Sequence, residues 1–173
     1  NIGANTPSYY YVYDYHGFIV SDAKASKNYP IYGVLYNWSA AMNGVASSTT
    51  NPSGIQGACP NGWHLPSDAE WTQLTTYLGG ESVAADKLKE IGSSHWNGTY
   101  NESNNETGFT ALPGGYRDDL GIFDEMGKAG IWWTATGDND LHACARSMNY
   151  YESTVDRGYH EKRLGFSVRC VKN

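Results

Sequence analysis

The stretch from Gly137 to Arg163 carries the side chains best suited to contact another molecule. Tyrosine, histidine, arginine and aspartate are mixed here without a clear period, although strongly patterned strings lie on both sides. These residue types supply stacking, hydrogen bonding and charge at modest cost in side-chain entropy, which is the chemistry of a recognition surface. We therefore predict a ligand-binding surface made of Asp138, Asn139, Asp140, His142, Cys144, Arg146, Tyr150, Tyr151, Asp156, Tyr159 and His160.

Signs of catalysis or metal binding are weak by comparison. The five histidines lack the spacing of metal ligands. No phosphate-binding loop, zinc-protease motif or nucleophile elbow occurs. Asp138 and Asp140 offer oxygen ligands for calcium, but they lack the spacing of an EF-hand, so we interpret them as part of a plain loop. We therefore expect a protein that is not an enzyme, with no cofactor and no metal.

Three cysteines, Cys59, Cys144 and Cys170, contain no Cys-x-x-Cys pair, so a zinc knuckle or a redox motif has no support. In an oxidising compartment two of them can form a disulfide. Cys59 precedes a Pro-Asn-Gly turn and Cys170 lies in a terminal strand pattern, so we pair these two and leave Cys144 free. Three reduced, buried thiols are the alternative.

Length and charge limit the possible partners. The chain has 173 residues, about one domain, and a net charge of −6, which disfavours binding to a phosphate backbone. No apolar run approaches the ~20 residues that span a bilayer, so we expect no direct membrane insertion. No signal peptide opens the sequence, and Asn1 is not an initiator Met, which suggests that a preceding region was removed.

The elements that position the candidate surface are expected to be helices in the first half of the chain and strands in the second half. Val34, Trp38 and Met42 recur at helical spacing and predict a helix over 34–42. A capping box at Ser67 and Glu70 starts a helix over 67–78, and a shorter helix follows over 82–91. Period-two or β-branched runs then predict strands, over 108–117, 121–124, 131–136, 142–150 and 166–171. Helices followed by short antiparallel strands indicate an α+β domain.

Five strings carry a family resemblance. They are YGVLYNW at 32–38, CPNGWHLPSDAEW at 59–71, GFTALPGGYR at 108–117, WWTAT at 132–136 and GFSVRCV at 165–171. Together they resemble the Fibrobacter succinogenes major paralogous domain, which occurs in secreted and surface proteins of Bacteroidetes and Fibrobacteres. The resemblance implies a C-type-lectin-like fold related to the formylglycine-generating enzymes, with two main helices packed on short twisted antiparallel sheets. It also supports the Cys59–Cys170 disulfide.

The resemblance divides the chain into a divergent N-terminal segment, residues 1–31, and a single globular domain, residues 32–173. The N-terminal segment is rich in tyrosine between Tyr9 and Tyr15, where we expect either a first strand or part of an interface with a preceding domain. Large apolar residues in the shared strings, Trp63 and Trp71 among them, are interpreted as core. His64 is interpreted as a core histidine whose ring nitrogens bond to backbone.

The layout also resembles the variable proteins of diversity-generating retroelements, in which adenines near the 3′ end of the gene are randomised. Residues that fit the resulting codon set are Asp138, Asp140, Leu141, His142, Cys144, Tyr151, Asp156, Gly158, Tyr159 and His160. An ordinary family member with drifted surface loops is the alternative.

These observations predict a non-enzymatic recognition domain of a surface-exposed bacterial or phage adhesin. Its partner would be a protein or glycan receptor on another cell surface, with no nucleic acid involved. The domain would belong to a longer protein or to a pilus or tail assembly, outside the cell, at its surface or on a phage particle. The alternative is a secreted carbohydrate-binding module attached to a glycan-degrading system, which exposed tryptophans in a flat row would favour.

Overall fold

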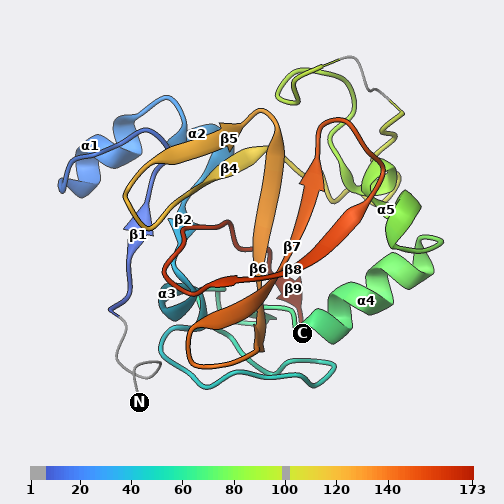
Figure 1. Ribbon diagram of the computed structural model, residues 1–173, viewed down its shortest axis with the longest axis horizontal. Coiled ribbons are helices and arrows are strands. Elements are labelled where there is room, and N and C mark those ends of the chain that lie inside the picture. Colours follow the sequence, from blue (N-terminus) through green and yellow to red (C-terminus); the bar gives the residue numbers. More distant parts are fainter. Residues whose placement is uncertain (1–6, 99–101) are drawn as a thin grey trace.

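The computed structural model describes residues 7–98 and 102–173 and shows a mixed α+β domain with short helices and curled sheets (Figure 1). Its helices are α1 (Val20–Ala25), α2 (Tyr29–Tyr32), α3 (Trp38–Met42), α4 (Asp68–Tyr77) and α5 (Glu81–Leu88). Its strands are β1 (Tyr10–Tyr11), β2 (Leu35–Tyr36), β3 (Trp63–His64), β4 (Gly114–Arg117), β5 (Phe123–Met126), β6 (Ala129–Gly137), β7 (His142–Asn149), β8 (Val155–Glu161) and β9 (Val171–Lys172).

The main sheet has five strands in the order β5-β4-β6-β7-β8. β4 runs parallel to β6, and the other neighbouring strands are antiparallel. Two small antiparallel sheets, β1-β2 and β3-β9, join distant parts of the chain. The sheet order makes β7 an inner strand and β8 an edge strand, so the two strands of one hairpin have different surroundings.

The two faces of β6 and β7 bury two separate core clusters. The first cluster lies around α3 and contains Trp38, Ala41, Met42, Cys59, Leu65, Trp133, Ala135, Ala143, Ala145 and Phe166. The second cluster lies under α4 and α5 and contains Trp71, Leu78, Ala84, Ala85, Leu88, Trp96, Ala111, Trp132, Met148 and Val155. Because successive side chains in a strand point to opposite faces, neighbours such as Trp132 and Trp133 serve different clusters.

α4 begins as the sequence predicts. The Ser67 hydroxyl accepts the Glu70 N–H, and the Glu70 carboxylate accepts the Ser67 N–H in return, which completes the capping box. Trp71 and Leu78 are buried on the inner side of the helix. The cap fixes the first turn of α4, and this turn carries Asp68.

Several predicted boundaries were wrong for local reasons. The helix expected over 34–42 starts only at Trp38, because Leu35 and Tyr36 pair with β1 and Asn37 caps α3. The strand expected over 166–171 is instead a run of single bridges to β2 and β6 that ends in β9. β8 was not expected as a strand at all.

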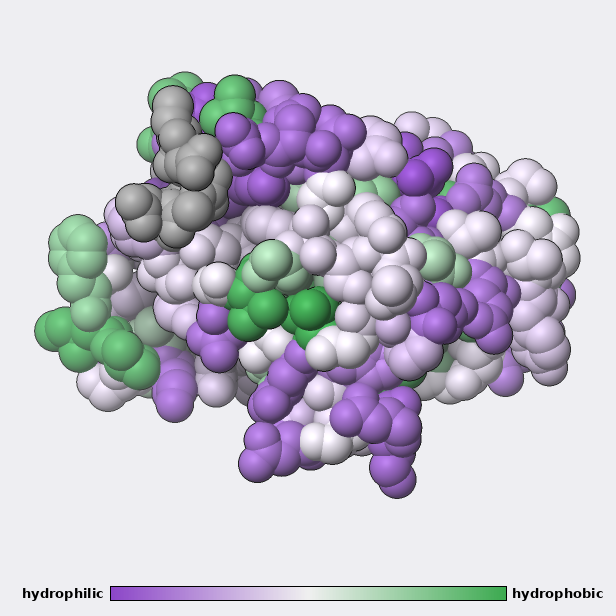
Figure 2. All heavy atoms as spheres, turned by 90° about the horizontal axis from the view of Figure 1, so that it is seen from below, coloured by the Kyte–Doolittle hydropathy of each residue, from purple (hydrophilic) through white to green (hydrophobic). Residues whose placement is uncertain are grey.

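The N-terminal segment packs onto the rest of the domain. β1 pairs with β2, which confirms a first strand among the tyrosines. Phe18, Ile19 and Val20 are exposed at the start of α1. Figure 2 shows a hydrophobic patch at the left, on the side of the molecule where Figure 1 places α1. Within residues 7–98 and 102–173, no helix has the length and apolar character needed to cross a membrane.

Trp63 does not lie in the core, in contrast to the sequence interpretation, because it is 39% exposed on the short strand β3. Gly115 has a backbone conformation that L side chains rarely adopt. Its φ is +62°, and a Cβ there would lie 2.2 Å from the carbonyl oxygen of Asp124. Only glycine fits at this crossing of β4 and β5.

Candidate functional site

The β7–β8 hairpin and the loop before it hold every residue predicted for the ligand surface, but they place these residues at two ends (Figure 1). The turn from β6 to β7 carries Asp138, Asn139 and Asp140, which are all exposed. The turn from β7 to β8 carries Tyr150 and Tyr151 at the opposite end of the hairpin. The predicted surface is therefore not one continuous patch.

The first end is an ordered loop built around Asn139. The side-chain oxygen of Asn139 accepts the N–H groups of Leu141 and His142, at 2.8 and 2.9 Å. The Lys162 ammonium donates to the Asn139 carbonyl, at 2.7 Å. Asn139 thus shapes the loop, and Asp138 and Asp140 are left to face solvent. Among the residues that the structure describes, no group of three or more possible metal ligands comes together.

The exposed face of β8 continues this end of the hairpin. Tyr159 is 48% exposed, and its hydroxyl accepts a hydrogen bond from Arg157 at 2.9 Å. The Arg157 guanidinium also lies over the Tyr159 ring, 5.5 Å from its centre. His142 lies across from Glu161 in the strand register, so the loop and the end of β8 meet here.

The opposite face of β8 carries Asp156 and His160, both half-buried. The His160 ring meets Phe166 edge to face at 5.2 Å. Burial, together with nearby His142, lowers the pKa of His160. Burial raises the pKa of Asp156, and the carboxylates of Glu152 and Glu81 act in the same direction. These two residues are less available to a partner than Tyr159.

The second end of the hairpin presents tyrosines. Tyr151 is 59% exposed, whereas Tyr150 is half-buried and packs against the second core cluster. The two rings meet edge to face at 5.2 Å. Tyr151 is the available aromatic side chain at this end.

Cys144 and Arg146 do not belong to any surface, which corrects the sequence prediction. Both are fully buried. The strand predicted over 142–150 was expected to present Cys144 and Arg146 to a ligand, but α4 and α5 cover the face that carries these two side chains. The first core cluster covers the other face. An inner strand under a helix layer has no exposed face.

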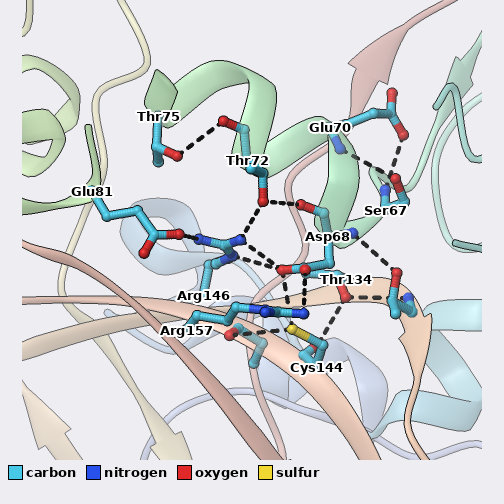
Figure 3. A network of polar contacts seen from close by, with 12 residues as sticks. Ser67, Asp68, Glu70, Thr72, Thr75, Glu81, Thr134, Cys144, Arg146 and Arg157 are labelled. Carbon is cyan, nitrogen blue, oxygen red and sulfur yellow. Dashed lines mark hydrogen bonds and ion pairs between the residues drawn. The ribbon is translucent and has the colours of Figure 1, made fainter. Parts of the chain in front are cut away.

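Arg146 is the centre of a buried polar network (Figure 3). Its Nη2 lies 2.7 Å from Oδ1 of Asp68, and Nη1 pairs with Glu81. Nη2 also donates to the Thr72 hydroxyl at 2.8 Å. A buried guanidinium needs such partners, because an unpaired buried charge is costly. The network ties β7 to the first turn of α4 and to the start of α5.

Asp68 extends this network outward to the surface. Its second oxygen, Oδ2, lies 2.7 Å from Nη2 of Arg157, whose side chain is 45% exposed. The Cys144 thiol donates to Oδ1 of Asp68 at 3.2 Å. Burial raises the pKa of Cys144 to about 11, and the Asp68 carboxylate acts in the same direction. The thiol is thus protonated at neutral pH and unreactive.

Arg157 is the surface residue that the sequence interpretation missed. Residues 155–161 read VDRGYHE, and the period-two spacing of Val155, Arg157 and Tyr159 is the signal that would have predicted the strand β8.

His64 is buried, as expected, but its ring nitrogens bond to side chains rather than to backbone. Nε2 lies 2.6 Å from Oε1 of Glu70, and Nδ1 lies 2.7 Å from the Asn173 side-chain oxygen. Burial lowers the pKa of His64, but the hydrogen bonds to Glu70 and Asn173 outweigh this effect and raise it overall. The pair joins α4 to the C-terminal end of the chain.

Cys59 and Cys170 form a disulfide, with their Cα atoms 5.8 Å apart, and Cys144 is free. The bond joins the loop before β3 to the residue before β9. These two strands pair with each other, so the disulfide lies next to one of the two small sheets.

Comparison with known proteins gives one match. No curated protein and no solved structure matches the chain. The family model described as the Fibrobacter succinogenes major domain matches residues 3–172. The match includes almost all of the N-terminal segment that the sequence analysis set apart. The chain therefore belongs to the Fibrobacter succinogenes major domain family.

Proposed function

We propose that this protein is a non-enzymatic ligand-recognition domain whose binding surface is the β6–β7 loop together with the exposed face of β8. The observation that carries this proposal is the pair formed by Arg157 and Tyr159. Asp68 holds the Arg157 guanidinium at 2.7 Å, and Arg157 in turn holds the Tyr159 hydroxyl. An arginine and a tyrosine fixed on a rigid strand resemble the anchors that dominate interfaces, because little entropy is lost when they bind.

The surroundings of this pair support a polar recognition surface. Asp138 and Asp140 supply negative charge and His142 supplies an imidazole at the same end of the hairpin. Tyr151 offers a second, separate contact at the far end. Cys144 and Arg146 have no part in binding in this proposal.

A C-type-lectin-like fold is part of the same proposal. It is supported by the family resemblance, by the packing of α4 and α5 on a largely antiparallel sheet, and by the disulfide beside β3 and β9. Such a fold would display the last strands and their loops on a framework held by α4.

Diversification of the surface is also proposed, now for a smaller set of positions. Exposed residues that fit the codon set are Asp138, Asp140, Leu141, Tyr151 and Tyr159. Cys144 fits the codon set but is buried, so it is better explained as a core position.

The proposed setting is the surface of a bacterial cell or a phage particle, as part of a longer protein. The disulfide is consistent with an oxidising compartment outside the cytosol. The alternative, a carbohydrate-binding module, is less favoured because five of the six tryptophans are buried and only Trp63 is exposed. The described residues, which include all six tryptophans, therefore contain no flat row of them.

To test the proposed binding surface, we compare serine variants at the two ends of the β7–β8 hairpin. One variant replaces Asp138, His142 and Tyr159, and the other replaces Tyr151 alone. Each substitution is at the surface and should change stability by about 0.5 kcal/mol or less. Binding of the purified domain is measured on bacterial cells and on a glycan array, and we expect the triple variant to lose the signal.

A matched control replaces the exposed Tyr9 and Tyr10 with serine. If this control loses binding and the triple variant retains it, the ligand site lies on the N-terminal segment and the proposal is wrong. If neither variant changes binding while all proteins stay folded, the hairpin is not the recognition surface.

A further inference from the structure

A groove of about 430 Å³ lies beside α4, away from the hairpin surface. Its walls are mostly apolar and include Pro66, Trp71, Leu74, Phe109 and Val171. Tyr77, at the end of α4, stands at the groove and is 86% exposed. The size and the apolar walls are those of a pocket for a small ligand.

Arg169 is the unusual residue of this groove. Its guanidinium lies over the Phe109 ring, 4.1 Å from the ring centre. Across residues 7–98 and 102–173, no hydrogen-bond acceptor or carboxylate is paired with it, whereas Arg117, Arg146, Arg157 and Arg163 each donate to an oxygen. Burial lowers the pKa of Arg169.

The rest of the groove does not supply the missing charge. Glu70 lines it, but one of its oxygens is bonded to His64 and the other accepts the N–H groups of Ser53 and Ser67. Both oxygens of Glu70 therefore already have hydrogen-bond partners outside Arg169. At the polar edge, the Asn51 amide donates to the Gln73 side-chain oxygen. The guanidinium of Arg169 is therefore the unmatched charge in this groove.

We propose that the groove binds a carboxylate attached to an apolar body. The planar fork of Arg169 would hold the carboxylate through two parallel hydrogen bonds, which is the geometry that guanidinium and carboxylate share. The apolar body would lie along Trp71, Leu74 and Tyr77. A free sugar acid fits less well, because its hydroxyl groups would face walls that offer few polar partners.

Matched pairs of small probes test this site on the intact domain. N-acetyl-L-phenylalanine represents the end of a peptide and octanoate represents a fatty acid, and each is compared with its own carboxamide. We expect each amide to bind ~10-fold more weakly than its acid, since a hydrogen bond to a charged group is lost. Calorimetry gives the affinities, and whichever acid binds more tightly identifies the source of the carboxylate.

Three variants locate the binding site. Arg169→Gln should weaken the acids but not the amides, and Arg163→Gln, which alters an exposed arginine elsewhere, should weaken neither. Because Arg169 is packed on Phe109, its variant is first checked for folding by circular dichroism. Tyr77→Ala changes only an exposed ring and should weaken both acids and amides by a similar factor.

Equal affinity for acids and amides would overturn the proposal, as would tight binding of glucuronate in place of both apolar acids. Loss of acid binding in Arg163→Gln but not in Arg169→Gln would do the same. The proposal does not depend on the hairpin surface, since none of these residues lies in β7 or β8.

Discussion

β7 and β8 are neighbouring strands of one hairpin, with similar mixtures of polar and apolar residues, yet they have opposite roles. β7 lies between two core clusters and buries both of its faces. β8 is the edge strand, and only Val155 among its residues is fully buried. A charged side chain in a strand therefore does not indicate by itself whether the strand faces solvent.

Arg146 and Arg157 show this difference between a buried and an exposed strand at a single cross-strand position. They lie directly opposite each other in the strand register, and both reach the carboxylate of Asp68. Arg146 is fully buried, whereas the Arg157 side chain is 45% exposed. The carboxylate of Asp68 thus joins α4 to a buried arginine of β7 and also positions a surface arginine of β8.

The largest expected effect comes from Arg146→Ala. This change leaves Asp68 buried without its main partner, and removal of one member of a buried pair costs ~3–5 kcal/mol. Equilibrium denaturation in urea measures the loss. Arg157→Ala is the matched control and should cost less than ~1 kcal/mol, as surface ion pairs do. Equal costs for the two variants would contradict the contrast between the strands.

The next effect concerns Cys144 and Tyr159, which also lie opposite each other. Cys144→Tyr adds a ring to a fully buried position, and overpacking of this kind costs ~1–3 kcal/mol. Tyr159→Cys should change the free energy of unfolding by only ~0.5 kcal/mol, because the ring is half exposed. Thermal unfolding of both proteins checks this. If Cys144→Tyr is tolerated, β7 can take part in surface diversification after all.

A smaller effect is expected from Ser67→Ala. Ser67 caps α4 just before Asp68. Loss of this cap loosens the first turn of the helix, which holds the carboxylate that pairs with Arg146 and Arg157. Loss of a cap costs ~1 kcal/mol, which denaturation can resolve. Thr76→Ala, in the last turn of the same helix, is the control and should cost less. A larger cost for the control would mean that the cap does not hold this turn.

The smallest expected effect is a dependence of the free energy of unfolding on pH, which comes from the contact between His64 and Glu70 of α4. The folded-state pKa of His64 is raised above 6.5, so its contribution to stability is present below that pH and is lost as the pH rises through the raised pKa. Burial raises the pKa of Glu70, but the hydrogen bonds from His64, Ser67 and Ser53 outweigh it and lower the pKa below 4.5. The contribution of Glu70 is present above that pH and is lost as the pH falls through the lowered pKa. We expect this pair to stabilise the fold most between about pH 4.5 and 6.5.

Melting temperatures measured from about pH 5 to pH 8 test whether stability falls as the pH rises, as the raised pKa of His64 predicts. The His64→Asn variant should lose the decline that the parent shows above about pH 6.5. A decline of the same size in the variant would assign it to other groups.

The sequence by itself determined the elements that depend on local interactions. The capping box at Ser67 and Glu70 predicts the start of α4 correctly, because both hydrogen bonds lie within one turn. The alternation of β7 correctly separates Ala143 and Ala145 from Cys144 and Arg146, because the period of a strand is fixed by its backbone. The shared strings also identified the family, which the match over residues 3–172 shows.

Only the tertiary structure decided which of these faces meets water. The cover over Cys144 and Arg146 comes from α4 and α5, which lie more than fifty residues earlier in the chain. The partner of Arg146 is Asp68, and the same carboxylate selects Arg157 as a surface anchor. Burial and charge pairing arise from contacts between distant segments, so no local pattern in 137–163 could separate the buried arginine from the exposed one.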